Sequence, residues 1–427
     1  MSGLLSKKVL KTASKTICIM AAVACAPITL ASASLATTAQ ASIAQTDLIK
    51  AGEYLATAGN CAGCHTSKDG DLYAGGVSFT TDFGEFYSTN ITSDPTYGIG
   101  KWTETDFKNA LRHGIRADGE HLYPVFPYTA YSALTDSDIA ALYTYFKTVP
   151  ASQTPSKEHD LSFPFNQRPL MAVWKALFFE PQTFANNPQQ TAEWNRGAYL
   201  VESLGHCSAC HTPRNLFGAE KEELAYSGES YLDYLPNGRK NNWYAVNLTQ
   251  SSDGLADWSK KDIEEYLSIG LNRFATSFGP MNKVISHSTS QLTPTDVAAM
   301  ATYLKSLPGS EESIPVELAK SDVRAGASLY SIHCATCHLP TGKGDIETGP
   351  ALLGNPIVEG KDPSSLINAI LYAPELPRKT LPVQRTKMDD YEHKLSNEEV
   401  ALISSYIRQA WGNAAKPVSP EQVEQQR

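Results

Sequence analysis

The sequence predicts a mainly helical protein built from three small domains in tandem. Three observations indicate this: a Cys-x-x-Cys-His motif occurs three times, a segment rich in glycine and aromatic residues precedes each motif, and a capped apolar helix follows each. Recurrence of one pattern along a chain is typical of a repeated structural unit. The three motifs span Cys61–His65, Cys207–His211 and Cys334–His338.

Local signals predict the helices around each motif. A glycine stands 9, 10 and 8 residues before the first cysteine of the successive motifs, at Gly52, Gly197 and Gly326. After each motif, a serine or threonine followed three residues later by an acidic residue forms an N-capping signal. Apolar residues then recur at helical spacing. The three capping residues are Thr135, Thr293 and Ser396.

These repeats and the segments between them give the expected domain boundaries. We expect domains at 42–150, 191–309 and 321–413, a linker with an apolar helix at 151–190, a linker at 310–320 and a polar tail at 414–427. The first two domains resemble each other more than the third, because Asn90-Ile91-Thr92 and Asn247-Leu248-Thr249 stand at one repeat position. This recurrence favours a structural role for the triplets over glycosylation.

Residues 1–41 are predicted to be a cleaved signal peptide. Four lysines precede an apolar stretch, no acidic residue occurs before Asp47, and Ala39-Gln40-Ala41 fits the A-x-A cleavage pattern. An uncleaved N-terminal anchor is the alternative interpretation. Cleavage removes Cys18 and Cys25, so all six remaining cysteines belong to the three motifs. We expect the mature protein outside the cytoplasm, in a compartment that permits disulfides.

The net charge argues against a nucleic-acid partner, and the hydropathy argues against a membrane-spanning helix after the N-terminal segment. Lys and Arg number 36 against 45 Asp and Glu, a net charge of −9, and this acidic balance argues against nucleic-acid binding. Beyond the N-terminus no stretch reaches the roughly 18 apolar residues that a membrane-spanning helix needs.

Cys-x-x-Cys-His is the attachment sequence of c-type haem. The two thiols each bond one vinyl group of the porphyrin, and the histidine binds the iron. A redox dithiol does not need the histidine, and a zinc site would combine two motifs and leave the third over. We therefore expect three haem c groups, attached through Cys61, Cys64, Cys207, Cys210, Cys334 and Cys337, with the axial histidines His65, His211 and His338.

A methionine is the usual second axial ligand in electron-transfer cytochromes. Met281 and Met388 stand shortly before the capped helices of the second and third domains, where a ligand loop belongs. We predict that they bind haem 2 and haem 3. Met300 lies on the apolar face of a helix and is expected in the core. His393, the rival of Met388, is expected to be exposed.

The first domain departs from this pattern, because the loop Tyr123–Tyr128 contains no methionine and Phe126 occupies the expected place. The sixth ligand of haem 1 is therefore unknown. His113, His121, a ligand from elsewhere and a five-coordinate iron all stay open. We expect haem 1 to differ from the others in spin state or potential. An open iron would also permit the alternative that the chain is a haem enzyme.

The chain resembles the trihaem cytochrome c subunits of membrane-bound dehydrogenases of acetic acid bacteria. The resemblance covers nearly the whole mature chain, with motifs at Tyr87–Thr92, Gly205–Cys207, Cys210–Asn215, Gly279–Met281 and Trp411–Asn413. It implies three class I cytochrome c domains and methionine ligands at Met281 and Met388. In that family the first domain usually has a Tyr-Pro-x-Met-Pro-Tyr loop, from which Phe126 departs.

The resemblance also implies the partners. Such cytochromes are not enzymes on their own, and they pass electrons from a catalytic subunit to ubiquinone at the periplasmic face of the cytoplasmic membrane. Phe126 and the segment Phe163–Phe179 are similar to cytochromes encoded beside molybdopterin subunits. This favours an aldehyde dehydrogenase complex with an iron–sulfur subunit. A quinoprotein alcohol dehydrogenase, a flavoprotein gluconate, sorbitol or fructose dehydrogenase, and a free soluble carrier are the alternatives.

Apolar residues recur at helical spacing in the segment between the first two domains. They are Leu170, Met171, Val173, Trp174, Leu177 and Phe178. Two interpretations stay open: the face packs between two haem domains, or it docks on the membrane surface or borders a quinone site.

Overall fold

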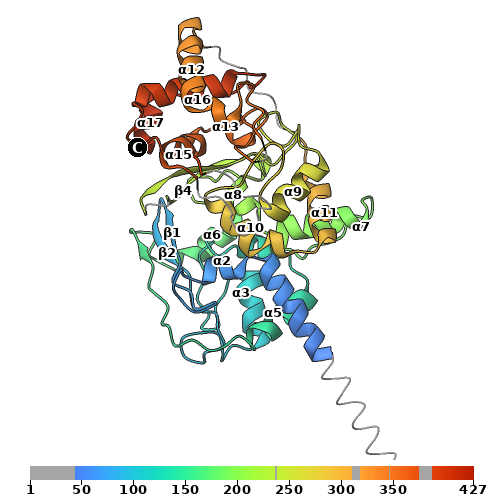
Figure 1. Cartoon of the computed structure of the whole chain (residues 1–427). Coiled ribbons are helices and arrows are strands. Elements are labelled where there is room, and N and C mark those ends of the chain that lie inside the picture. Colours follow the sequence, from blue (N-terminus) through green and yellow to red (C-terminus); the bar gives the residue numbers. More distant parts are fainter. Residues whose placement is uncertain (1–43, 236–237, 310–317, 346, 375–386) are drawn as a thin grey trace, which may run out of the picture. The chain divides into compact units, whose positions relative to one another are not determined.

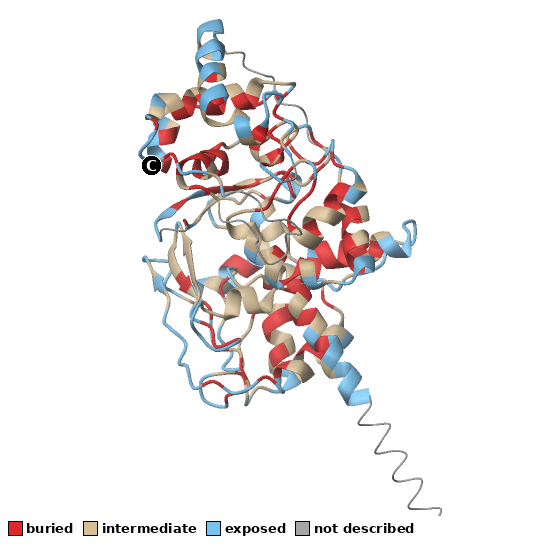
Figure 2. Ribbon diagram, viewed as in Figure 1, coloured by how far each residue is buried: buried red, intermediate tan, exposed pale blue. Residues whose placement is uncertain are grey.

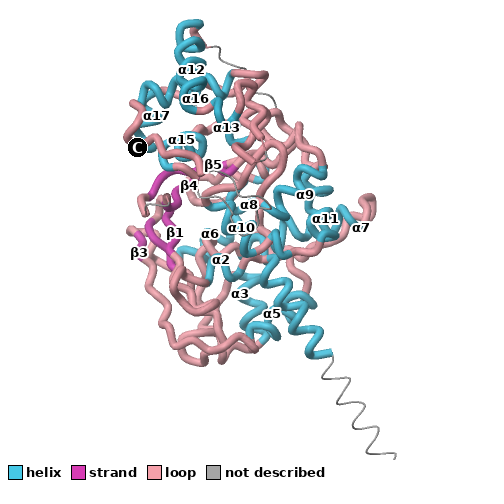
Figure 3. Tube along the Cα trace, in the orientation of Figure 1, coloured by secondary structure: helices cyan, strands magenta, loops and turns pink. Residues whose placement is uncertain are grey.

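The computed structural model describes residues 44–235, 238–309, 318–345, 347–374 and 387–427, and residues 48–427 form one compact unit (Figure 1). The predicted signal peptide lies outside the described residues. Helices predominate and strands are confined to short segments (Figure 3). The mainly helical class is therefore confirmed.

The first repeat begins with helical residues 48–58, which lead into the first motif. Its further elements are α2 (Cys61–His65), β1 (Ser78–Thr81), β2 (Gly84–Tyr87), α3 (Glu104–His113), α4 (Tyr128–Tyr131) and α5 (Asp136–Phe146). The connection to the second repeat contains β3 (Asp160–Leu161) and α6 (Leu170–Phe178). Helix α6 is the apolar helix expected there.

The second repeat begins with α7 (Ala192–Ala198), which continues as a π-helical turn, η1 (Tyr199–Leu204). Its further elements are α8 (Ser208–His211), η2 (Glu222–Leu224), β4 (Glu229–Tyr234), β5 (Lys240–Ala245), α9 (Lys260–Ile269), α10 (Pro280–His287), η3 (Thr289–Gln291) and α11 (Pro294–Leu304).

The third repeat ends in a packed helix. Its elements are α12 (Lys320–His333), α13 (Ala335–His338), α14 (Pro356–Glu359), α15 (Ser364–Tyr372), α16 (Asn397–Gln409) and α17 (Pro420–Gln426). We expected a polar tail at 414–427, but α17 lies there and contacts α15 and α16. Val423 is fully buried in the core of the third repeat, because it is the apolar residue on the inner face of this otherwise polar helix.

A glycine lets the first helix of each repeat cross the last one at close range. A Cβ atom at Gly52 would lie 2.1 Å from the carbonyl oxygen of Ala141 on α5. The corresponding distances are 2.0 Å from Gly197 to Ala299 and 2.5 Å from Gly326 to Leu402. No side chain fits at such separations, so the glycines in the sequence mark the helix crossings.

The predicted N-caps are also present. Thr135, Thr293 and Ser396 each accept a hydrogen bond, 3.2 Å long, from the backbone N–H of the acidic residue three positions later. Each cap satisfies one of the amides that the first turn of a helix leaves without an intrahelical partner.

Two small antiparallel sheets accompany the helices. Strands β1, β2 and β3 form one sheet and β4 pairs with β5 in a hairpin. The sequence does not predict these sheets, because the strands are short and lack an alternating apolar pattern. Strand β5 joins the second repeat to the third: Tyr244 N–H donates to Ser365 Oγ on α15 over 2.8 Å, and that hydroxyl donates back to the Tyr244 carbonyl.

Buried hydrophobic residues form two large clusters. Figure 2 shows the buried positions in red along the ribbon. The larger cluster contains residues from both the first and the second repeat, and the other belongs to the third repeat. The first two repeats therefore share one continuous core. Among the described residues, no helix is both long and apolar enough to cross a membrane.

Replacing Gly197 with alanine should destabilise the protein by about 1–3 kcal/mol, because the new methyl group overlaps the Ala299 carbonyl and separates α7 from α11. Urea unfolding followed by circular dichroism measures the loss. Gly70→Ala is the matched control, since its methyl group overlaps only the flexible Ser67 hydroxyl and makes ordinary contacts otherwise. Equal stability of the two variants would contradict the role of the crossing.

Candidate haem sites

Each motif places two cysteines and a histidine on one short helix. Cys61, Cys64 and His65 lie on α2. Cys207 is the N-cap of α8, and Cys334 is the N-cap of α13. None of the six motif cysteines is paired in a disulfide within the described residues. One helical turn thus presents two attachment points and one imidazole in a fixed relation at all three sites.

The three histidines make the same second contact. Nδ1 of His65 lies 2.7 Å from the Thr89 carbonyl oxygen, Nδ1 of His211 lies 2.7 Å from that of Val246, and Nδ1 of His338 lies 2.8 Å from that of Pro350. A carbonyl only accepts, so each Nδ1 carries the proton. In the neutral ring Nε2 then carries the lone pair, which is the tautomer in which an imidazole binds a metal through Nε2.

Burial lowers the pKa of His65 and of His211, and the hydrogen bond to the carbonyl opposes this effect only in part. Both rings are therefore neutral at neutral pH. Neutral imidazole is the form that binds iron.

Two buried asparagines fix the carbonyls that orient these histidines. Asn90 follows Thr89, and its Oδ1 accepts hydrogen bonds from the backbone N–H and the hydroxyl of Thr92 at 2.9 and 2.7 Å. Asn247 follows Val246 and accepts the same pair from Thr249 at 2.8 and 2.7 Å. The Asn-x-Thr triplets therefore have the structural role that their recurrence suggested, although the sequence did not reveal the link to the histidines.

At the third site a glycine, and not an asparagine, stands beside the carbonyl that accepts from the histidine. A Cβ at Gly349 would lie 3.1 Å from the Cys337 carbonyl oxygen and 3.2 Å from Nδ1 of His338, so glycine relieves a tight contact where the next carbonyl, that of Pro350, meets the ring. This dependence was invisible in the sequence, because the third repeat has no Asn-x-Thr triplet.

Two buried indole nitrogens test whether the residues fit a haem. Trp258 stacks on Phe274 with ring centroids 5.8 Å apart, and its Nε1 has no hydrogen-bond partner among the described residues. Nε1 of Trp243 is likewise buried and unpaired in the described part of the chain. Buried donors normally have acceptors, and the propionate carboxylates of a haem would supply them. The paired thiols, the oriented imidazoles and these donors all fit haem c.

Both candidate methionine ligands border a repeat core. Met281 packs on the cluster that also contacts Cys207, and Met388 packs on the cluster that contacts Cys334. Met281 lies in the first turn of α10 rather than on the expected loop, because Pro280 starts a helix directly before it. Met300 is 3% exposed and the His393 side chain is 87% exposed, as predicted.

The loop of the first repeat is held by aromatic contacts. The ring of Phe126 lies 5.5 Å from that of Tyr131. Lys175 Nζ of α6 donates to His121 Nδ1 over 3.1 Å and to the His113 carbonyl over 2.7 Å. With Nδ1 accepting, a neutral His121 carries its proton on Nε2, so neither ring nitrogen offers a free lone pair in this arrangement.

Comparison with known proteins agrees with this geometry. The cytochrome c family model matches residues 49–150 and 323–411. The chain is 38% identical over 409 residues to the cytochrome c subunit of the quinone alcohol dehydrogenase of Gluconacetobacter polyoxogenes, covering 91% of this chain and 86% of that one. It therefore belongs to the family of cytochrome c subunits of dehydrogenases.

Two further relatives support the assignment. The gluconate 2-dehydrogenase cytochrome c subunit of Pantoea cypripedii is 38% identical over 386 residues, which cover 86% of this chain and 87% of the relative. A dihaem c-type cytochrome of Cereibacter sphaeroides is 40% identical over 265 residues, 61% of this chain and 86% of the relative. The relatives confirm the prediction of a cytochrome subunit that carries covalent haem c and is not an enzyme on its own.

Asn90→Ala should lower the free energy of unfolding of this cytochrome by about 2–4 kcal/mol, because it leaves buried Thr92 donors and the carbonyls of Ser152 and Thr154 without partners. Urea unfolding of the holoprotein measures the change. Asn166→Ala, at an exposed position, is the control and should stay within about 0.5 kcal/mol of the wild type. A loss no larger than that of the control would contradict the anchoring role.

Proposed function

We propose that this cytochrome carries three haem c groups and transfers electrons from the catalytic subunit of a membrane-bound dehydrogenase to ubiquinone. The observation that carries the proposal is the threefold recurrence of one arrangement: two cysteines and a histidine on a short helix, with Nδ1 of the histidine on a backbone carbonyl. A site repeated three times in one chain suits a relay, in which each centre accepts and donates one electron.

The protein would hold each group through its own residues. The cysteine pairs of the motifs form the thioether links, and His65, His211 and His338 bind the irons through Nε2. When bound, haem c supplies one-electron oxidation and reduction. The surrounding chain keeps the imidazoles neutral and oriented, excludes water with aromatic side chains, and offers the Trp243 and Trp258 N–H groups to carboxylates.

We propose a molybdopterin aldehyde dehydrogenase with an iron–sulfur subunit as the catalytic partner. Phe126 and the aromatic segment that ends at Phe179 support this choice through their resemblance to cytochromes of that group. Relatives that serve alcohol and gluconate dehydrogenases have nearly equal identity to this chain. A quinoprotein alcohol dehydrogenase and a flavoprotein gluconate or sorbitol dehydrogenase are therefore the alternatives.

Affinity purification from native membranes tests the proposal. We expect the tagged chain, extracted in mild detergent, to contain three covalent haems by pyridine haemochrome assay, to copurify with a large molybdopterin subunit and a small iron–sulfur subunit, and to be reduced by acetaldehyde. Copurification with a quinoprotein and reduction by ethanol would select the alcohol dehydrogenase. A chain that elutes alone, or that contains fewer than three haems, would overturn the proposal.

The methionines should determine the properties of two haems. Met281→Leu and Met388→Leu should each remove one low-spin His/Met signal from the electron paramagnetic resonance spectrum and lower one midpoint potential, because methionine ligation raises the potential. Phe126→Met should add a third such signal. Met300→Leu, a change in the core, is the control and should leave all the spectra unchanged.

Spectra and ligand binding of the wild-type protein distinguish an electron-transfer role of haem 1 from an enzymatic one. Three indistinguishable low-spin His/Met spectra would contradict a distinct haem 1. Rapid binding of cyanide or carbon monoxide to one haem, together with turnover by the isolated chain, would favour the alternative of a haem enzyme.

We further propose that the cytochrome, after export with cleavage of residues 1–41, docks on the periplasmic surface of the cytoplasmic membrane through α6. One face of this helix is packed: Trp174 is buried beside Tyr128, and its Nε1 donates to the Phe217 carbonyl over 2.8 Å. The other face is open, with Val173 58% and Leu177 68% exposed. Further exposed apolar residues on this helix and the neighbouring loops are Phe163, Leu170, Leu216 and Phe217.

The exposed face of α6 and the neighbouring loop residues Leu216 and Phe217 are all apolar. Such a surface suits insertion at the lipid interface. The double variant Val173→Glu/Leu177→Glu should lose most of its binding to phospholipid vesicles in a flotation assay, because both charges would enter the apolar layer. Ile332→Glu, at an equally exposed apolar position on α12, should bind as the wild type does. Unchanged flotation of the double variant would contradict the docking face.

A further inference from the structure

Tyr54, in the first helix of the first repeat, reaches the last helix of the second repeat. Its hydroxyl donates to Asp296 Oδ2 over 2.6 Å and accepts a hydrogen bond from the Thr293 N–H over 3.2 Å. Thr293 is the N-cap of α11 and Asp296 stands in its first turn. The tyrosine therefore attaches to the N-terminus of a helix that belongs to the other repeat.

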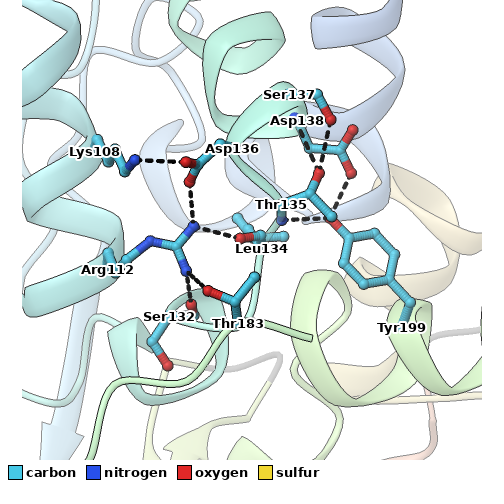
Figure 4. Close-up of polar contacts among 10 residues, drawn as sticks. All are labelled: Lys108, Arg112, Ser132, Leu134, Thr135, Asp136, Ser137, Asp138, Thr183 and Tyr199. Atoms are coloured by element: carbon cyan, nitrogen blue, oxygen red, sulfur yellow. Dashed lines mark hydrogen bonds and ion pairs between the residues drawn. The ribbon is translucent and has the colours of Figure 1, made fainter. Parts of the chain in front are cut away.

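Tyr199, in the first helical segment of the second repeat, makes the reverse contact. Its hydroxyl donates to Asp138 Oδ2 and accepts from the Thr135 N–H over 3.3 Å (Figure 4). Thr135 is the N-cap of α5 and Asp138 stands in its first turn. Each of the first two repeats thus holds the N-cap of the other through a tyrosine two residues after the crossing glycine.

Such an exchange of identical contacts is the signature of an isologous pair, here formed by two repeats of one chain. The described residues of the third repeat do not take part in this exchange. Ser328 stands two residues after Gly326, and the hydroxyl of the nearby Tyr330 donates to the Leu339 carbonyl of its own repeat over 2.6 Å.

Arginine side chains fix the N-termini of α5 and α11, to which the two tyrosines bind. Arg112 of α3 is buried and donates to the Ser132 and Leu134 carbonyls at 2.5 and 2.6 Å, directly before the start of α5 (Figure 4). Arg196 of α7 forms a bidentate pair with Asp296 at 2.8 and 2.7 Å. The tyrosines therefore bind fixed points and not mobile helix ends.

Between these two contacts the haem attachment segments approach each other. Helix α10, which carries Met281, contacts α2, and Ser288 Oγ donates to the Ala58 carbonyl over 3.0 Å. In the reverse direction α4 contacts η1, and the Tyr131 ring lies 5.5 Å from that of His206, directly before Cys207. In each of the two repeats, the short helix that follows the haem motif thus lies against the attachment segment of the other repeat.

We propose that Tyr54 and Tyr199 are positioning residues that clamp the first two repeats into one rigid two-haem unit and thereby set the rate of electron exchange between haem 1 and haem 2. This inference rests on the proposed trihaem function. Electron tunnelling slows exponentially with the separation between donor and acceptor, so small opening motions at the repeat boundary reduce the rate strongly. The clamps act on the separation and leave the iron ligands untouched.

The test uses the full holoprotein with Tyr54→Phe, Tyr199→Phe and the double variant. Tyr330→Phe is the matched control, because it removes one hydroxyl hydrogen bond within the third repeat. After confirmation of three covalent haems, pulse radiolysis measures electron exchange and potentiometry measures each midpoint potential. The exciton splitting of the Soret circular dichroism band reports the haem–haem arrangement.

We expect the double variant to exchange electrons between haem 1 and haem 2 at least several-fold more slowly and to have a smaller exciton splitting, with unchanged midpoint potentials. Each single variant should show a weaker effect, because one clamp remains. Asp138→Asn retains an acceptor for the Tyr199 hydroxyl and should exchange at the wild-type rate.

An exchange rate of the double variant equal to that of Tyr330→Phe would overturn the inference while leaving the trihaem function intact. An equal slowing in Tyr330→Phe would also overturn it, since the effect would then come from general loosening. Fewer than three haems in the wild type would instead refute the proposed function.

Discussion

The close crossing of the first and last helices of each repeat is the constraint on which the rest of the structure depends. Gly52, Gly197 and Gly326 allow backbone to meet backbone at this point. Each crossing fixes where the following Cys-x-x-Cys-His turn begins and where the final helix starts. The same crossings orient Tyr54 and Tyr199 toward the neighbouring repeat. Attachment of the cofactor and association of the first two repeats therefore have one geometric origin.

Short-range patterns in the sequence were sufficient to predict the N-caps at Thr135, Thr293 and Ser396 and the helical class. The cysteine and histidine sites, which rest on the Cys-x-x-Cys-His motifs, stay predictions. Short-range patterns could not predict that Thr89, Val246 and Pro350 accept from the histidines, since a carbonyl acceptor has no residue signature. They also missed the hairpin of β4 and β5, whose stability depends on its contacts with α15. The carbonyl acceptors and the hairpin depend on contacts between residues far apart in the sequence, which local sequence patterns do not reveal.

Helix α6 has one packed face and one exposed face. Trp174 and Phe178 pack against the Tyr128 loop and the turn at Phe217, whereas Val173 and Leu177 face outward. The helix is apolar on both sides, although only its inner face packs against the rest of the protein. Lys175 adds a polar contact on the inner side, where its Nζ reaches the Gly114 carbonyl over 2.5 Å.

The separate core of the third repeat has a consequence for the evolution of such chains. Its hydrophobic cluster shares no residue with that of the first two repeats, and polar contacts such as Tyr244–Ser365 join the two parts. Loss or gain of the C-terminal repeat would leave the larger core intact. We therefore expect shortening or extension of the gene at this boundary to leave the side chains of the larger core unchanged.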